Sequence, residues 1–370
     1  MITNTIKKAL YSLIVLTSSV FIFVACGSDD EEQYIAVPVS PVVLDLDAAI
    51  FPYEKLSEYN FFQGEMKDLD PVYKVIPYDL NSSLFTDYAK KKRFIYMPPG
   101  VQATYSADGK VLEFPQGTVL IKNFYYDNMV GGDANRIIET RLMIRKNNDW
   151  VFATYVWNNE QTEAILDNDG SYAHLTWNEN GVEMNTNYRI PSVVECTACH
   201  KIGEVKSAIG VKPQNLNKMF AYPEGTKNQL AKLVEEGYLS SANLPSQIVS
   251  TVDWADTSKP LELRVRSYLD INCAHCHSEG TSCDYTPMRL GFAESTTAAS
   301  LGVCIEPVEF VTGNQQYIVA GQNATRSLMH FRMSTNIQSE MMPLVGRTVV
   351  HTEGLELVEQ WITAMESPCP

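Results

Sequence analysis

Between residues 60 and 190, apolar positions come in short runs of strand length. These runs are rich in Val, Ile, Phe, Tyr and Trp, and they cover residues 93–97, 117–126, 137–146 and 150–158. Branched and aromatic side chains fit the pleated surface of a sheet. Lys146-Asn147-Asn148-Asp149 separates the last two runs and predicts a hairpin turn. Short strands with turn signals between them predict a β-sandwich-like domain.

Beyond residue 190, apolar positions recur at helical spacing. Helices are expected over residues 226–237, 260–272 and 353–365, each with one apolar stripe. Their inward residues are Leu230, Leu233 and Val234; Leu261, Val265, Tyr268 and Leu269; and Leu355, Val358, Trp361, Ile362 and Met365. Gly237 is the expected stop of the first helix. The pattern predicts an α+β multidomain protein, in which mainly α-helical regions follow the β-sandwich-like domain.

The first 26 residues are typical of an export signal. Lys7 and Lys8 precede an apolar run that ends at Ala25-Cys26, as in secretory signals with a lipoprotein cleavage site. The run is at the lower limit of length for a transmembrane helix. We therefore expect lipidation at Cys26, which becomes the mature N-terminus, and an acidic tether over residues 27–58. Such a protein is an outer-membrane lipoprotein of a Gram-negative bacterium, facing the periplasm or the cell surface, with the lipid as its only membrane contact.

Composition and charge narrow the classes of partner. The chain has 370 residues, 45% of them hydrophobic, and a formal net charge of −15. This composition is that of a folded protein with two or three domains. A nucleic-acid-binding surface needs clustered Lys and Arg, and the only basic run of this acidic chain, Lys90-Lys91-Lys92-Arg93, is four residues long. The charge instead favours a protein partner with a basic docking patch.

Two segments carry the candidate chemistry, Cys196-Thr197-Ala198-Cys199-His200 and Cys273-Ala274-His275-Cys276-His277. Both are C-x-x-C-H, the motif of covalent haem c attachment. In this motif the cysteines form thioethers with the vinyl groups of one haem, and the histidine becomes the proximal iron ligand. Zinc sites place two C-x-x-C pairs roughly 15–20 residues apart, far closer than the pairs here. Redox dithiols or disulfides would leave both histidines without a role. The sequence thus predicts two covalently bound haem c groups, with His200 and His277 as iron ligands.

The distal ligands differ between the two motifs. Met342, in a Met-Pro loop ahead of the last helix, is the expected thioether ligand of the second iron, with Met341, Met333 and His330 as rivals. No such loop follows His200. Its distal ligand is left open among Met219, Met184, His174, another side chain of the β-rich domain and an open position. His275 is expected to face solvent.

Three cysteines remain, Cys283, Cys304 and Cys369. Export permits disulfides. The preferred pair is Cys283 with Cys304, and Cys369 is the alternative partner of either one.

The last third of the chain resembles a known type of cytochrome. The segment Val-Ala-Gly-Gln-Asn-Ala-Thr-Arg-Ser-Leu (319–328), with Arg332-Met333 and Met342-Pro343, resembles the planctomycete-type cytochrome c domain. From about residue 60 onward the chain resembles an uncharacterised family of bacterial dihaem c-type cytochromes. That resemblance rests on Pro77-Tyr78-Asp79-Leu80-Asn81, Phe85-Thr86-Asp87-Tyr88, Arg93-Phe94-Ile95-Tyr96-Met97-Pro98-Pro99-Gly100, Phe114-Pro115-Gln116-Gly117-Thr118, Glu139-Thr140-Arg141-Leu142, Tyr155-Val156-Trp157-Asn158, Ile190-Pro191-Ser192, Gln214-Asn215-Leu216-Asn217 and Asn228-Gln229-Leu230. It implies haem binding and electron transfer, with no particular substrate.

The expected organisation is a signal (1–26), a tether (27–58), a β-rich domain (59–190), a first haem-binding region (191–257) and a cytochrome c-like second haem domain (258–370). We expect an electron-transfer protein between periplasmic or cell-surface partners rather than a catalyst. Two alternatives stay open. One is a peroxidase-like dihaem oxidoreductase that uses the first haem as its active site, and the other is a glycan- or protein-binding module with accessory haem. No hydrolase triad, phosphate loop or other separate catalytic constellation is visible.

Overall fold

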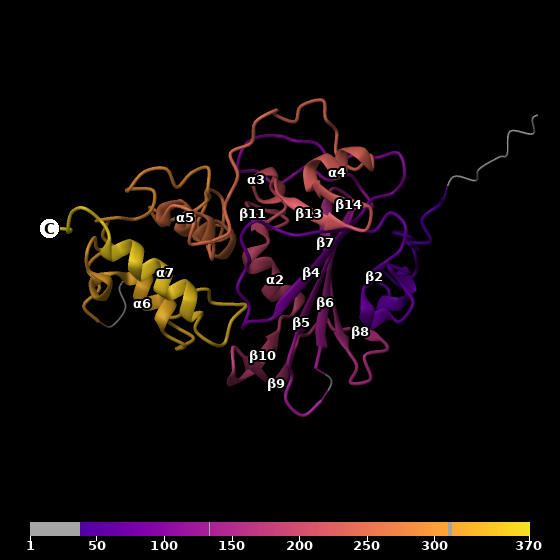
Figure 1. Ribbon diagram of the computed structural model, residues 1–370, viewed down its shortest axis with the longest axis horizontal. Helices are drawn as coiled ribbons and strands as arrows, with labels where there is room; N and C mark the ends of the chain where they lie inside the picture. The colour runs from indigo at the N-terminus through magenta and orange to yellow at the C-terminus, as the bar shows by residue number, and fades with distance from the viewer. Residues whose placement is uncertain (1–37, 133, 310–312) are drawn as a thin grey trace, which may run out of the picture. The chain divides into compact units, whose positions relative to one another are not determined.

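The centre of the fold is one antiparallel sheet whose six strands follow each other in chain order, β3-β4-β5-β6-β7-β8 (Figure 1). The computed structural model describes residues 38–132, 134–309 and 313–370. The chain divides into two units, 1–39 and 40–370, and the sheet belongs to the second. Its strands are β3 (Ile76–Tyr78), β4 (Lys90–Tyr96), β5 (Val119–Tyr126), β6 (Arg136–Lys146), β7 (Asp149–Trp157) and β8 (Ala164–Leu166). The predicted hairpin is confirmed, since Lys146 pairs with Asp149 around Asn147 and Asn148, which both have positive φ.

The two faces of the sheet pack against different parts of the chain. One face, with Phe94, Ile121 and Tyr155, packs against residues 42–75, which contain only short elements. These are η1 (Leu56–Tyr59), β1 (Phe62–Gln63), η2 (Met66–Asp68) and β2 (Asp70–Pro71). Much of the expected tether therefore packs on the sheet. On the other face, Leu120 and Phe152 join a core with residues 208–239.

The prediction of a β-sandwich-like domain is wrong. Apart from the central sheet, every sheet in the described residues has two strands. The longest pair, β9 (Ser171–Glu179) with β10 (Val182–Ile190), packs on one end of the central sheet through Trp177, Tyr188 and Tyr126. Irregular segments and short elements cover the sheet faces, because they bring enough apolar side chains to bury them without a second sheet.

The prediction that the haem regions are mainly α-helical is also wrong. Residues 191–257 contain α-helices of 7, 4 and 7 residues, together with two small hairpins. Residues 258–370 contain α-helices of 12, 7 and 12 residues. The elements in chain order are α2 (Val193–Cys199), β11 (Lys201–Ile202), β12 (Val205–Lys206), α3 (Pro213–Leu216), β13 (Met219–Tyr222), β14 (Gly225–Asn228), α4 (Gln229–Glu235), α5 (Leu261–Asn272), η3 (Ala324–Arg326), α6 (Leu328–Ser334) and α7 (Thr352–Thr363).

Local capping explains why one helix is shorter than expected. The Asn228 side chain accepts hydrogen bonds from Leu230 N and Ala231 N, so α4 starts at Gln229 and not at Thr226. The helices α5 and α7 lie where they were expected. Val265 and Leu269 of α5 pack with Val358 and Ile362 of α7 in one core, and α6 lies beside α7 (Figure 1).

The disulfide joins Cys304 to Cys369, so the preferred pairing of Cys283 with Cys304 is wrong. The segment around Val319 brings the two partners together, because Cys304 N donates to Val319 O and Gly321 N donates to Cys369 Sγ. Cys283 is instead a free thiol. Its backbone N–H donates to Cys276 O, which holds it beside the second motif.

No helix among the described residues has the length and apolar character needed to cross a bilayer. Cys26 and the export signal lie outside the described residues.

A buried aspartate connects the front half of the chain to the loop that follows Met342. Asp87 is 1% exposed and has a φ of 45°. Its carboxylate accepts hydrogen bonds from Thr348 N (2.6 Å), Thr348 Oγ1 (2.8 Å) and Val349 N (3.0 Å). Burial raises the pKa of this carboxyl. One side chain thus holds a loop that is 261 residues away in the sequence.

We expect Asp87→Ala to lower the free energy of unfolding by about 3 kcal/mol, because the donors of Thr348 and Val349 lose their buried acceptor. Asp87→Asn keeps an oxygen for both amides and tolerates a positive φ, so its loss should stay below about 1 kcal/mol. Urea unfolding of the full chain measures both. Equal losses in the two variants would show that the oxygen acceptor is not what matters.

Candidate functional site

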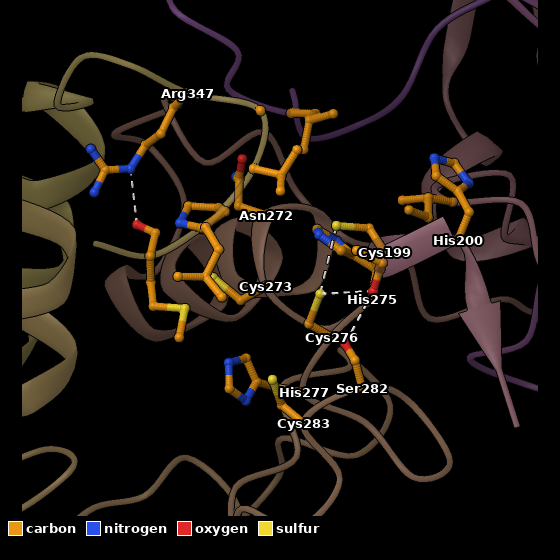
Figure 2. A pocket seen from close by; sticks show the side chains of 18 of the residues that line it. Cys199, His200, Asn272, Cys273, His275, Cys276, His277, Ser282, Cys283 and Arg347 are labelled. Atoms are coloured by element: carbon orange, nitrogen blue, oxygen red, sulfur yellow. Dashed lines mark hydrogen bonds between the residues drawn. The ribbon is translucent and has the colours of Figure 1, made fainter. Parts of the chain in front are cut away.

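A cavity of about 570 Å³ lies where the sheet, α2, the end of α5 and the Met342 loop meet (Figure 2). Its volume is within the range of about 300–1,000 Å³ that is usual for ligand sites. All six cysteines and histidines assigned to the two motifs line it, as does Met342: Cys196, Cys199, His200, Cys273, Cys276, His277 and Met342. Residues that were predicted separately are therefore brought to one place.

The helix α2 positions the first motif. Ser192 and Glu195 form a reciprocal capping box at its start, where Glu195 N donates to Ser192 Oγ and Ser192 N donates to Glu195 Oε2. The helix ends at Cys199, and His200 is its C-cap. The sequence positions the two cysteines one helical turn apart, so both side chains project from the same side.

The imidazole of His200 is held in one orientation. Its Nδ1 lies 3.0 Å from Ser207 O, and a carbonyl oxygen can only accept, so Nδ1 carries the hydrogen and Nε2 keeps its lone pair. The Phe152 ring packs 5.4 Å from the imidazole centroid. Burial lowers the pKa of His200 to about 3. The side chain is therefore a neutral imidazole whose Nε2 is available as a ligand.

The second motif repeats this arrangement with different partners. The helix α5 runs into Cys273, and His277 N donates to Cys273 O. Nδ1 of His277 lies 3.3 Å from Thr286 Oγ1, and that hydroxyl donates its own hydrogen to Cys283 O. The hydroxyl therefore accepts from His277 Nδ1, which again leaves Nε2 as the ligand atom. Burial lowers the pKa of His277 to about 4.

The two motif loops contact each other directly. The Sγ atoms of Cys199 and Cys276 are 3.7 Å apart (Figure 2). Two hydrogen bonds hold the loops at this distance, from Gly203 N to Gly280 O (2.6 Å) and from Ser282 Oγ to Ala198 O (3.1 Å). The contact between the two thiols lowers the pKa of Cys276 and raises the pKa of Cys199.

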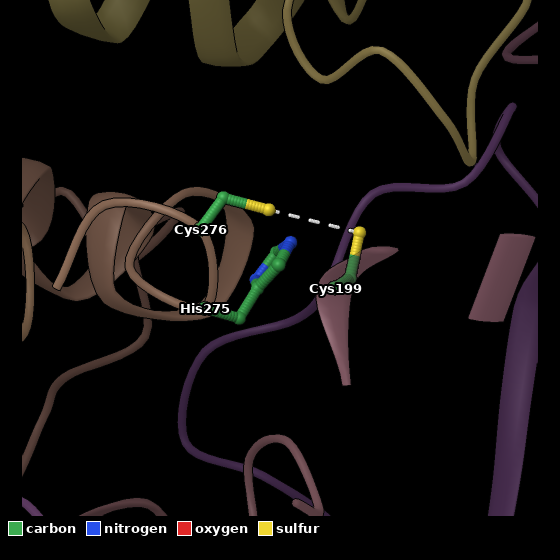
Figure 3. A group of neighbouring side chains, drawn as sticks. All are labelled: Cys199, His275 and Cys276. Atoms are coloured by element: carbon green, nitrogen blue, oxygen red, sulfur yellow. Dashed lines mark hydrogen bonds between the residues drawn. The ribbon is translucent and has the colours of Figure 1, made fainter. Parts of the chain in front are cut away.

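His275 does not face solvent as expected. It is half-buried, it lines the cavity, and its buried Nδ1 has no hydrogen-bond partner. The ligand atoms of Cys199, His275 and Cys276 all lie within 4.8 Å of one another (Figure 3). Such a trio can hold a soft metal ion such as zinc. No sequence motif predicts this trio, because Cys199 is far from His275 and Cys276 in the chain.

Met342, the expected distal ligand of the second iron, lines the cavity. Its carbonyl accepts a hydrogen bond from Arg347 Nε (3.0 Å). Met333 also lines the cavity, whereas Met341 is buried outside it. His330 does not line the cavity and lies 3.6 Å from Glu359 Oε2.

For the first iron, none of the named candidates reaches the cavity. Met219 is 58% exposed on β13, and Met184 and His174 belong to the β9–β10 hairpin. None of the three lines the cavity. Met143 of β6 and Met288 do line it. Met143 belongs to the β-rich domain, whose side chains were among the alternatives left open, whereas sequence reasoning missed Met288 because it does not stand in a Met-Pro loop.

The donor set fits haem c better than it fits a metal ion alone. Each motif presents two thiols and one oriented neutral imidazole, and the walls between them are largely apolar, with Leu120, Phe152, Leu290 and Ile318 among the lining residues. A metal ion at Cys199, His275 and Cys276 would use one cysteine of each motif. It would leave Cys196, Cys273, His200 and His277 without a role.

Comparisons with known proteins identify no family for this chain. No protein-family model matches this chain. No curated protein and no solved structure matches it with significance.

Proposed function

We propose that this chain is an exported dihaem c-type cytochrome that transfers electrons between periplasmic or cell-surface redox partners. The observation that supports this most directly is the single cavity lined by both C-x-x-C-H motifs, with an oriented, neutral histidine in each. The resemblance of residues 60–370 to dihaem cytochromes points the same way, and it rests on different residues.

The roles of the side chains follow from their chemistry. Each cysteine thiol adds across one vinyl double bond, so that a carbon–sulfur bond forms and the thiol hydrogen moves to the neighbouring carbon. His200 and His277 offer Nε2 to iron, and their Nδ1 hydrogen bonds hold the rings in place. Met342, which lines the same cavity, would offer its thioether to one of the irons. When bound, haem supplies the one-electron redox couple.

Contact between the motifs favours a relay. Cys199 and Cys276 belong to different haem sites, yet their sulfurs are in contact at 3.7 Å. Cys199 would hold one haem and Cys276 the other, so the two points of attachment would be neighbours. The two motifs would hold both haems at this cavity, and the chemistry they would supply there is one-electron transfer between donor and acceptor.

The proposed setting is the outer membrane, with Cys26 as a lipid anchor. The formal net charge of −15 suits docking on a partner with a basic patch and not on nucleic acid.

We expect two haems per chain. The intact mass of the protein, made in a host with cytochrome c maturation, should exceed the processed chain by two haems, and Cys273→Ala with Cys276→Ala should leave one. Cys283→Ala is the matched control, because it removes a cavity cysteine outside both motifs and should keep two. Elemental analysis provides the opposing outcome: zinc at one equivalent and no iron would replace this proposal with a metal site at Cys199, His275 and Cys276.

We expect Met342→Ala to abolish the near-infrared sulfur-to-iron band of one haem completely, and to let that iron bind carbon monoxide or cyanide. Met219→Ala, on the exposed face of β13, should change neither property. Absorption spectra of both variants test this. If the unaltered protein already has a high-spin iron that reacts with peroxide, the first haem is catalytic and the peroxidase-like alternative replaces the carrier.

We expect Cys26→Ser to move the protein from the membrane fraction to the soluble fraction, because the thioether-linked lipid cannot form. Fractionation and immunoblotting measure the shift, with Cys283→Ser as the control that stays membrane-bound. Retention of the Cys26→Ser variant in the membrane fraction would disprove the anchor.

A further inference from the structure

A row of three cations lies across neighbouring strands of the central sheet, and two of them line the cavity. In the register of the sheet, Arg93 of β4 is directly opposite Lys122 of β5, and Lys122 is directly opposite Arg141 of β6. Lys122 and Arg141 line the cavity. Like charges that face each other across neighbouring strands destabilise a sheet. Such a row of cations is therefore expected only where another interaction offsets the repulsion between them.

Two of the three cations have a carboxylate partner. Arg93 Nη1 lies 2.6 Å from Asp79 Oδ1. Arg141 Nε donates to Glu139 Oε2 (2.8 Å), and Glu139 also accepts from the Tyr188 hydroxyl (2.6 Å). The donors around Glu139 therefore already use both of its oxygens.

Lys122 is the exception. Among the described residues its ammonium has no hydrogen-bond acceptor and no ion-pair partner, and its nearest stabilising contact is the Phe124 ring, 4.8 Å away. Arg141 and Lys91 share the same ring. Burial, together with the neighbouring Arg93, Lys91 and Arg141, holds the pKa of Lys122 well below its usual range. An anion in the cavity would relieve this repulsion and restore the charged form.

We propose that Lys122 and Arg141 form a carboxylate-binding site on the sheet wall of the cavity. A carboxylate suits the site because it can accept from the Lys122 ammonium and from the Nη1 hydrogens of Arg141, which Glu139 does not use. The chemistry has two possible sources. One is a propionate of the haem attached at Cys196 and Cys199, in which case the site rests on the proposed function. The other is a small free carboxylate that enters the cavity.

The test compares the full-length holoprotein with Lys122→Met, which removes the charge and keeps the length of the side chain. Lys92→Met is the matched control, because Lys92 is an exposed neighbour on β4. Lys122→Arg should retain the behaviour of the unaltered protein. If Lys122→Met does not accumulate, Lys122→Gln takes its place. Intact mass first establishes that every variant carries two haems, so a failure of the proposed function is recognised before this inference is tested.

Two readouts then separate the sources. If a propionate occupies the site, Lys122→Met shifts the propionate bending band in the resonance Raman spectrum. The same variant lowers the reduction potential of the haem that lacks the sulfur-to-iron band. Acetate does not change the spectrum of the unaltered protein in this case. If the ligand is free, the Raman band stays in place, and acetate causes a saturable spectral change whose Kd rises about tenfold or more in Lys122→Met, as expected for one charge-assisted hydrogen bond. An unchanged Raman band together with no acetate response in the unaltered protein would overturn the inference.

Discussion

The contact between the two motif loops is the constraint on which the proposed site depends. Cys199 and Cys276 lie 3.7 Å apart because the flanking backbones are held by the Gly203–Gly280 and Ser282–Ala198 hydrogen bonds. Those bonds fix the relative position of the end of α2 and the end of α5. Everything that lines the cavity between them, from the oriented imidazoles to the Met342 loop, is arranged around this contact. Without it the chain would carry two separate sites.

The sheet contributes to the site through the face that is not occupied by the aromatic core. Its rows alternate in character: Leu120 and Phe152 belong to an apolar row, and Arg93, Lys122 and Arg141 belong to the next one. An apolar row therefore lies next to a charged row on the face of the sheet that contributes to the cavity. The strands are part of the cavity wall, and the region without C-x-x-C-H motifs belongs to the same compact unit as the motifs.

The sequence predicts the structure correctly where neighbouring residues alone determine it. The hairpin at Asn147-Asn148 and the apolar faces of α5 and α7 follow from neighbouring residues, and the structure has them where they were expected. The prediction of a sandwich failed because it depends on long-range packing: the runs of apolar residues specify strands but not what covers them. The same reason explains the disulfide, since the partner of Cys304 was decided by the packing of Val319 and Gly321 and not by spacing.

The sequence by itself determined which residues are the candidates for the proposed chemistry, because C-x-x-C-H places two thiols and an imidazole within one turn of chain, and no long-range contact is needed to bring them together. Only the tertiary structure decided that both motifs open on one cavity, that His275 faces inward, and that Lys122 stands in a row of cations. These facts depend on contacts between residues far apart in the chain. Such contacts form only when the buried faces of the sheet and helices pack, and a linear pattern does not record which buried face meets which.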